Sequence, residues 1–169
     1  MLYREHGVGV EFISSPAQFG DKDLIIIPGS KNTIGDLDYI KKTGLAQKAV
    51  EFAAKGGMLM GICGGYQMLG KRISDPGRCE TDAGETEGLG LLDFEVTMLP
   101  EKVTAQSSGK IDFEGEGLFA ALNGCSIEGY EIHMGHNVYG AAAVPVAYLG
   151  RRGGGGAGGP DMVCNGEGN

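Results

Sequence analysis

One cysteine of the chain has neighbours that suit a nucleophile. Residues 61–65 read Gly-Ile-Cys63-Gly64-Gly, directly after an apolar run and before a segment that favours a helix. A nucleophile at such a tight strand-to-helix turn needs small neighbours, because the backbone is strained and passes close to itself. The first amides of the helix favour the thiolate and can receive an oxyanion. The pattern indicates a cysteine nucleophile, and a buried structural cysteine also fits it.

A thiol nucleophile needs a base, and the chain contains three histidines. His6 lies among the first residues and is typical of a surface position. His133 and His136 lie at the end of a predicted strand, residues 127–133. Either of these two could reach Cys63 from a neighbouring strand end, and spacing alone does not choose between them.

Other kinds of site have weaker support in the sequence. The segment from Gly29 to Thr33, Gly-Ser-Lys-Asn-Thr, follows a strand but lacks the complete pattern of a phosphate-binding loop. The glycines of residues 153–159 follow no clear strand and begin no helix, which disfavours a dinucleotide site. The four cysteines are spaced widely and irregularly, with no C-x-x-C pair. We therefore predict neither a metal site nor a disulfide framework.

The composition excludes several classes of partner. The chain has 169 residues, of which 41% are apolar, and 14 Lys and Arg against 22 Asp and Glu give a formal net charge of −8. Nonspecific binding to nucleic acid or to an anionic membrane calls for a basic patch instead. No apolar run approaches the roughly 18 residues of a membrane span, and the first residues do not resemble a signal peptide. We expect a cytoplasmic protein that binds neither nucleic acid nor membrane.

The elements that must position Cys63 alternate between strand and helix. Residues 24–27 and 58–62 are apolar at every position, which is typical of strands buried on both faces in a parallel sheet. Another short strand is predicted at residues 8–13. Helices are predicted from Asp36 to near Gly44, then over residues 45–53, and after Cys63. This order predicts a doubly wound α/β domain, whose sites lie at the carboxyl ends of the strands.

The second half of the chain predicts further strands. Residues 74–87 are polar and are expected to form a surface loop. Strands are predicted beyond it, at residues 91–98, 102–106, 110–113, 127–133 and within 138–149. The last twenty residues, 150–169, are rich in glycine and are expected to form a mobile loop or tail. The predicted domain is therefore residues 1–149.

Three segments together resemble a known family, the glutaminase domain of cobyric acid synthase. They are Pro-Gly29-Ser30-Lys-Asn-Thr-Ile, then Gly-Ile-Cys63-Gly-Gly-Tyr-Gln67-Met-Leu-Gly, then Tyr-Glu-Ile-His133-Met-Gly. A fourth matching piece is Gly-Leu-Gly-Leu-Leu at residues 88–92. The resemblance covers roughly residues 8–140. It implies a flavodoxin-like, doubly wound, mostly parallel sheet of the class I glutamine amidotransferase type, with added strands in the second half.

The resemblance also implies the chemistry. Cys63 would attack the side-chain carboxamide of L-glutamine and form a thioester, and His133 would act as base and acid. The backbone N–H groups of Gly29 and Gly64 would hold the oxyanion, and Ser30 and Gln67 would contact the substrate. Ammonia would pass to an ATP-using synthetase domain with its Mg²⁺, in cis or in a partner subunit. That domain would hold the corrinoid acceptor, cobyrinic acid a,c-diamide, in cobalamin biosynthesis, and this chain itself would hold no cofactor.

Two departures from the family patterns qualify these expectations. Many class I amidotransferases carry an acid two residues after the histidine, where this chain has Gly135. The cobyric acid branch shares this feature, so a Cys-His dyad is expected. Glu131, two residues before His133, is a possible orienting group, but no sequence pattern supports that role. The synthetase domain, the first glutaminase strand and the final segment of the family are missing from the matched region. The domain is therefore expected to be trimmed at both ends, with weak or no activity alone.

Two alternatives remain open at the level of sequence. The glutaminase subunit of a lipid II amidating ligase shares the Cys-Gly-Gly-Tyr-Gln segment, although the Ser-Lys-Asn-Thr loop favours the cobyric acid branch. A binding module that keeps the strand-to-helix turn and has lost the chemistry is the other alternative. A glutamine-analogue affinity label separates an enzyme from such a module, because only an activated thiol in a formed pocket reacts.

Overall fold

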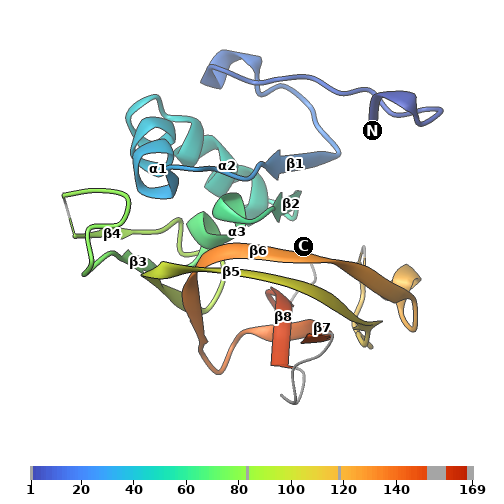
Figure 1. Cartoon of the computed structure of the whole chain (residues 1–169). Coiled ribbons are helices and arrows are strands. Elements are labelled where there is room, and N and C mark those ends of the chain that lie inside the picture. Colours follow the sequence, from blue (N-terminus) through green and yellow to red (C-terminus); the bar gives the residue numbers. More distant parts are fainter. Residues whose placement is uncertain (1, 83, 118, 152–158, 167–169) are drawn as a thin grey trace.

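Two short parallel strands carry the loops on which the candidate site is built. The computed structural model describes residues 2–82, 84–117, 119–151 and 159–166. β1 (Leu24–Ile27) pairs with β2 (Met58–Gly61) in a parallel register that aligns Leu24 with Met58 and Ile27 with Gly61. Both strands were predicted from their continuous apolar pattern. Their carboxyl ends lie together, so the loop after β1 and the turn after β2 meet at one edge (Figure 1).

Three helices accompany these strands: α1 (Thr33–Lys42), α2 (Leu45–Ala54) and α3 (Gly64–Leu69). The first helix begins four residues earlier than a cap at Asp36 predicts. Asn32 is its N-cap, and the Asn32 side chain accepts a hydrogen bond of 3.1 Å from the N–H of Gly35. Gly44, at φ 81°, separates α1 from α2. The order strand, helix, helix, strand, helix confirms the α/β character of the first half.

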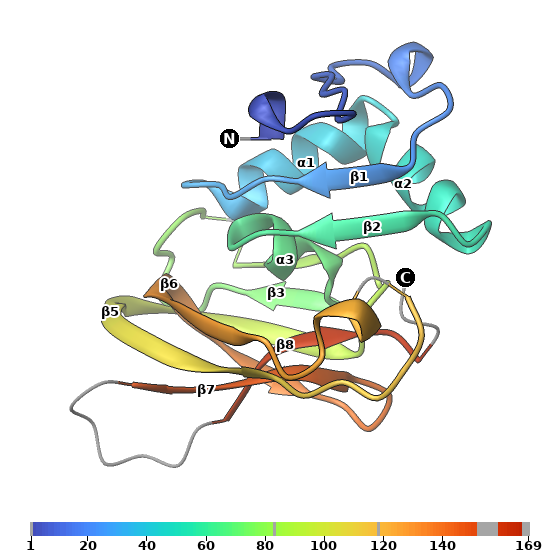
Figure 2. The same ribbon diagram turned by 90° about the vertical axis from the view of Figure 1, so that its right-hand side faces the viewer.

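A second, larger sheet occupies the rest of the chain. It contains β3 (Arg72–Ser74), β4 (Glu85–Glu87), β5 (Phe94–Ile111), β6 (Ser126–Tyr139), β7 (Val144–Arg151) and β8 (Gly159–Cys164). The strand order is β4-β3-β5-β7-β8, and β6 also pairs with β5. β3 runs parallel to β5, and the other pairs are antiparallel. These are the added strands expected in the second half, and Figure 2 shows the long β5–β6 ribbon beside α3.

The long strands merge several shorter predicted ones. Residues 94–111 form one strand, in place of three, because pairing with β6 continues on both sides of a register shift between Thr97 and Lys102. The predicted loop of residues 74–87 contributes β4 at its end. Three short 3-10 helices complete the described elements: η1 (Leu2–Arg4), η2 (Pro16–Gln18) and η3 (Ala120–Leu122).

Two predictions about the ends of the chain differ from the structure. Residues 8–13 form no strand and are largely exposed. Among the described residues β1 pairs only with β2, so residues 8–13 have no strand with which to form backbone hydrogen bonds. The predicted tail contains the end of β7 and all of β8, because Val163 and Cys164 are buried against the second sheet. Residues 152–158 and 167–169 of that prediction lie outside the described residues.

The main core lies between the helices and the second sheet. Its fully buried members come from α1, α3, β3 and β5: Ile34, Leu37, Met68, Leu69, Ile73, Phe94, Val96 and Met98. Full burial of such a side chain contributes about 1.5–3 kcal/mol. Tyr66 of α3 stacks on Phe94 at a centroid distance of 4.8 Å, and Tyr139 of β6 packs edge-on against the same ring at 5.8 Å. The core therefore fixes α3 against the strands that bear His133.

None of the helices among the described residues has the length and apolar character needed to cross a lipid bilayer.

Candidate active site

Cys63 occupies a strained turn between β2 and α3. Its backbone has φ 52° and ψ −114°, in a region that side-chain-bearing residues rarely adopt. Such a conformation costs of order 1–3 kcal/mol and persists only when the surrounding structure imposes it. The predicted elbow is thus present, with the nucleophile candidate at its tip. The Cys63 residue is exposed.

Two glycines make this turn possible by close packing. A Cβ atom at Gly65 would lie 2.1 Å from the carbonyl oxygen of Ile27, at the end of β1. A Cβ atom at Gly61 would lie 2.5 Å from the Cα atom of Tyr66. Both distances are far below contact distance, so any side chain at either position would push α3 away from the strands. The glycines on either side of Cys63 are therefore required by the geometry, as the sequence pattern predicted.

The Cys63 thiol lies against strand β6. Its Sγ atom is 3.8 Å from the carbonyl oxygen of Ile132, the residue before His133. Gly29, at the end of β1, approaches from another side, since a Cβ atom there would lie 3.5 Å from the Cβ of Cys63. Three segments that are distant in sequence therefore meet at Cys63. They are the segments on which the resemblance rests.

His133 lies in the same cavity as Cys63, with its ring engaged by other groups. Its Nε2 atom is 2.8 Å from Oε1 of Glu131, and its Nδ1 atom is 3.1 Å from the carbonyl oxygen of Gly135. In the described part of the chain neither ring nitrogen bonds the thiol. Both partners are acceptors, so the two bonds form together only when the ring carries both protons. A ring nitrogen could face the thiol only if the ring released one of these two partners.

The other two histidines lie elsewhere. His136 is exposed on β6 opposite Thr97, and His6 is exposed beyond η1. Neither lines the cavity that contains Cys63. The structure thus distinguishes His133 from His136, which sequence spacing alone could not do.

Glu131 orients His133 and is itself held in place. Its Oε1 atom bonds the His133 ring, and its Oε2 atom accepts a 3.3 Å hydrogen bond from the hydroxyl of Ser107 on β5. Ser107 is 4% exposed, so its end of this contact is buried. The sequence offered Glu131 only as an unsupported possibility, and it missed Ser107 because the two residues meet through strand pairing.

Ser30, predicted to contact substrate, is engaged within its own loop. Its hydroxyl donates to Oδ2 of Asp36 over 2.5 Å and accepts a 2.9 Å hydrogen bond from the N–H of Asn32. Ser30 also packs against the elbow, since a Cβ atom at Gly64 would lie 3.0 Å from the Cβ of Ser30. The structure therefore brings Gly29, Ser30 and Gly64 together beside Cys63.

Gln67, also predicted to contact substrate, links α3 to β6. Gln67 is 7% exposed, and its Nε2 donates a 2.9 Å hydrogen bond to the carbonyl oxygen of Met134. Its Oε1 accepts a hydrogen bond of 3.4 Å from the hydroxyl of Thr33. The Gln67 amide thus holds the residue that follows His133.

A cavity of about 410 Å³ opens beside the elbow. This volume is within the usual range of small-molecule pockets, about 300–1,000 Å³. Its polar lining includes Cys63, Gln67, Glu131, His133 and Asn137, and apolar residues of β2 and β8 form much of the remainder. Within the described ranges, no group of three or more His, Cys, Asp or Glu side chains is arranged to hold a metal ion. The cavity is suited to a small polar molecule with an apolar stem.

Tyr66 supplies a neutral hydroxyl at the cavity wall. Burial, followed by a 3.5 Å contact with the Tyr139 hydroxyl, raises the pKa of Tyr66 well above its usual range. The Tyr66 side chain therefore stays protonated and adds no charge to the pocket.

Comparison with known sequences gives one consistent set of relatives. Cobyric acid synthases of Dehalococcoides mccartyi (strain CBDB1) and Alkaliphilus metalliredigens are 50% identical over 129 residues and 47% identical over 152 residues. These matches cover 76% and 90% of this chain, and 25% and 30% of the respective relatives. The cobyric acid synthase of Clostridium acetobutylicum is 46% identical over 141 residues, 83% of this chain and 27% of that protein. The chain thus spans less than a third of these relatives.

Comparison with solved structures shows the fold. A crystal structure of a glutamine amidotransferase superposes with a TM-score of 0.55 at 18% identity, and the match covers 84% of this chain and 68% of that one. This likeness confirms the predicted α/β fold of the glutamine amidotransferase type. The model of the CobB/CobQ-like glutamine amidotransferase domain matches residues 1–168, which include β8. The chain therefore belongs to the CobB/CobQ-like glutamine amidotransferase family.

Proposed function

We propose that this chain is the glutaminase part of a cobyric acid synthase-like enzyme and releases ammonia from L-glutamine. The observation that carries the proposal is the strained Cys63 turn, which opens onto a cavity that His133 also lines. A strained backbone with an exposed thiol is costly to maintain, and such geometry is concentrated at functional sites. Family membership supports the same reaction.

The proposed reaction begins at the Cys63 sulfur. The thiolate attacks Cδ of the glutamine side chain, and the carbonyl electrons move onto oxygen, where the N–H groups of Gly29 and Gly64 stabilise the negative charge. His133, having taken the thiol proton, gives it to the leaving nitrogen. The C–N bond breaks, ammonia departs, and a γ-glutamyl thioester remains on Cys63.

Water completes the cycle. His133 takes a proton from water, which attacks the thioester carbonyl, and the C–S bond breaks. The sulfur recovers the proton as glutamate leaves, so the balance is glutamine plus water to glutamate plus ammonia. Glu131 stabilises the charged ring that forms twice in this cycle.

Gln67 and Ser30 remain predicted substrate contacts. For Gln67, a bond to glutamine would have to coexist with, or replace, its bond to Met134. The Ser30 hydroxyl already donates a hydrogen bond to Asp36 and accepts one from Asn32. Because a hydroxyl oxygen has two acceptor positions, a donor of the substrate would use the second one.

The acceptor of the ammonia is proposed from the relatives. Each of the cobyric acid synthases matched is more than three times longer than the matched segment. We propose that an ATP-using, Mg²⁺-dependent synthetase domain, in cis or in a partner subunit, uses the ammonia to amidate carboxylates of cobyrinic acid a,c-diamide. The reaction is proposed for the cytoplasm, where thiols stay reduced. The isolated chain is expected to hydrolyse glutamine weakly or not at all.

Mass spectrometry after incubation with 6-diazo-5-oxo-L-norleucine tests the glutaminase proposal. This glutamine analogue alkylates the thiol of a formed glutamine site, and we expect modification confined to Cys63, with Cys125 as the exposed internal control. A folded chain that is not labelled, or is labelled equally at Cys125, would contradict a working glutamine pocket in this chain. Repeating the reaction on the complete protein then separates a pocket that needs its other domains from a non-catalytic module.

A further inference from the structure

A continuous set of hydrogen bonds joins three segments around Cys63. The Gln67 side chain of α3 donates to the carbonyl of Met134 on β6, over 2.9 Å. Thr33, at the first position of α1, faces the other end of the same amide at 3.4 Å. Thr33 is 1% exposed and Gln67 is 7% exposed, so this connection is shielded from water. The start of α1, the nucleophile helix and the strand of His133 are therefore coupled through two side chains.

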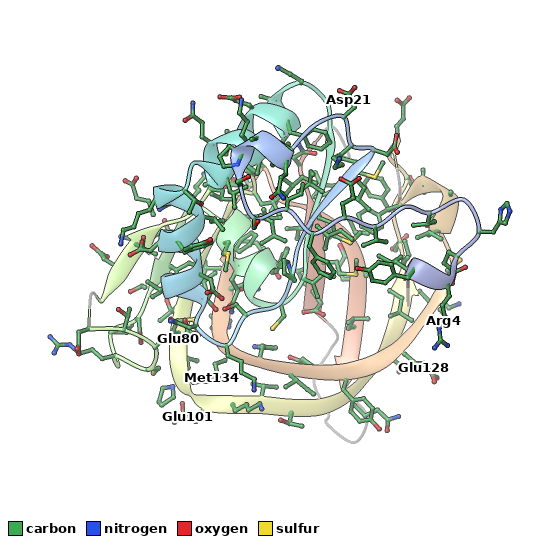
Figure 3. All side chains as sticks on the ribbon, turned by 90° about the horizontal axis from the view of Figure 1, so that it is seen from above. Arg4, Asp21, Glu80, Glu101, Glu128 and Met134 are labelled. Carbon is green, nitrogen blue, oxygen red and sulfur yellow. The ribbon has the colours of Figure 1, made fainter. Side chains whose placement is uncertain are left out.

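Glu80 anchors the outer end of this connection. Its Oε2 accepts from the N–H of Ile34 over 3.2 Å, and its Oε1 lies 3.2 Å from the Thr33 hydroxyl, whose single proton is shared between this oxygen and Oε1 of Gln67. Glu80 comes from the segment between β3 and β4, far from α1 in sequence. A carboxylate at this place also offsets the partial positive charge of the helix start. Figure 3 shows Glu80 and Met134 on the same side of the molecule.

Asp75 fixes the segment that presents Glu80. Its buried carboxylate accepts hydrogen bonds from the N–H groups of Cys79, Glu80 and Thr81, at 2.7, 2.8 and 3.1 Å. Burial alone would raise the pKa of Asp75, but these backbone bonds outweigh it and hold the pKa below its usual value. The carboxylate is therefore charged at neutral pH, and Glu80 is held at a defined position.

The start of α1 in turn locates the loop beside the thiol. A Cβ atom at Gly64 would lie 3.0 Å both from Ser30 and from the Thr33 hydroxyl, so the start of α1 is in close contact with the elbow. Gly29 immediately precedes Ser30 and lies beside Cys63. A shift of Thr33 by a fraction of an ångström therefore moves the predicted oxyanion donor at Gly29.

We propose that Glu80 is a positioning residue of the glutaminase site, which acts through Thr33 and Gln67 to hold the Gly29 loop and β6 in register with Cys63. The inference rests on the proposed function. It assigns a role in catalysis to a segment that the sequence predicted to be only a surface loop.

Two near-isosteric substitutions test the proposal. Glu80→Gln keeps the shape and one acceptor oxygen but presents an NH₂ group to one of its two donors. Thr33→Val keeps the volume and removes the hydroxyl. The matched control is Glu128→Gln, the same charge change at an exposed position of β6, which Figure 3 shows well away from Glu80. Circular dichroism and thermal unfolding report the fold of each variant.

The readout compares two reagents that react with the same sulfur. 6-Diazo-5-oxo-L-norleucine needs an aligned glutamine site, whereas iodoacetamide needs only an exposed thiol. We expect each variant to slow labelling of Cys63 by the glutamine analogue about tenfold, with labelling by iodoacetamide changed less than about twofold. The double variant should be no slower than the slower single variant, because both substitutions break one connection. Glu128→Gln should match the unsubstituted chain.

Each other outcome has a distinct meaning. Labelling of Glu80→Gln at the control rate with both reagents overturns the inference and leaves the proposed function standing. An equal slowing with both reagents, accompanied by a lower melting temperature, assigns Glu80 a role in stability alone and also overturns it. Absence of labelling of the unsubstituted complete protein by the glutamine analogue, while iodoacetamide still reacts, overturns the proposed function itself.

Discussion

The Sγ atom of Cys63 and the carbonyl oxygen of Ile132 lie 3.8 Å apart, although 69 positions separate the two residues. The contact brings the elbow against the backbone of β6 immediately before His133. The side chains of Glu131 and His133 then reach each other along the same strand. The candidate nucleophile and base are thus supplied by different sheets, and the packing of α3 between them sets their separation.

Replacement of Cys63 by glycine should stabilise the chain while abolishing its chemistry. Glycine adopts positive φ without the strain that Cys63 bears at 52°. We expect the free energy of unfolding to rise by about 1 kcal/mol, measured by urea denaturation, with labelling by the glutamine analogue lost. Cys125→Gly, at an exposed position with no positive φ, should bring no such gain. A less stable Cys63→Gly chain would show that the turn is not strained.

Replacement of Gly65 by alanine should displace α3. The added Cβ atom would lie 2.1 Å from the carbonyl oxygen of Ile27, and backbone cannot yield as a side chain can. We expect a loss of about 2 kcal/mol or more in the free energy of unfolding, together with loss of labelling at Cys63. Gly9→Ala is the control, since a Cβ atom there meets no atom within 4 Å. Equal stability of the two variants would be inconsistent with the packing described.

Replacement of His133 should reduce turnover far more than replacement of His136. General acid-base catalysis contributes about 10²–10⁴-fold, so His133→Ala should lower the kcat of glutamine hydrolysis within that range. The assay requires the complete protein, because the isolated chain is expected to be weakly active. His136→Ala, on the same strand and outside the cavity, should change kcat less than about twofold. Similar losses in both variants would contradict the assignment of His133.

Stability at low pH should depend on Asp75. The folded-state pKa of this carboxylate is lowered from the ordinary value of 3.8, because the effect of burial is outweighed by three backbone N–H bonds. Its contribution to stability is therefore complete above pH 3.8 and is lost as the pH falls through the lower folded-state value. Asp75→Asn should cost about 2 kcal/mol at pH 7, because its NH₂ group would face N–H donors.

Urea denaturation at pH 7 and at pH 2.5 to 3, roughly one unit below the ordinary value, checks this expectation. The difference between the Asp75→Asn chain and the unsubstituted chain should shrink at the lower pH. Asp82→Asn in the same segment is the control, since the Asp82 side chain is 97% exposed. A difference that does not change with pH would mean that the charge of Asp75 is not what holds the segment.

The elbow was predictable because its determinants are local. A strand without polar residues, three closely spaced glycines and a cysteine specify the turn within eight residues, 58–65. β1 was predicted for the same reason. The family resemblance then drew together Gly29, Cys63 and His133, which lie in separate segments, and the structure places all three segments beside Cys63.

The contributions of Glu80 and Ser107 could not be predicted, because they depend on which segments meet in space. Glu80 lies in a polar stretch that is typical of a surface loop, and only the fold places it at the start of α1. The strand predicted at residues 8–13 failed for a related reason. Its alternation is suited to a sheet, but a strand forms only where a neighbour offers its backbone groups.

The brevity of α3 has a consequence for how the site opens. With six residues, Gly64–Leu69, this helix is far too short to persist by its own hydrogen bonds. Its order derives from the Tyr66 ring stacked on Phe94 and from the Gln67 bond to β6. Its amide protons should therefore exchange with deuterium only as fast as the β5–β6 ribbon separates from it. We therefore expect the helix and that ribbon to open together, which would loosen the nucleophile and the strand that carries its proposed base at the same time.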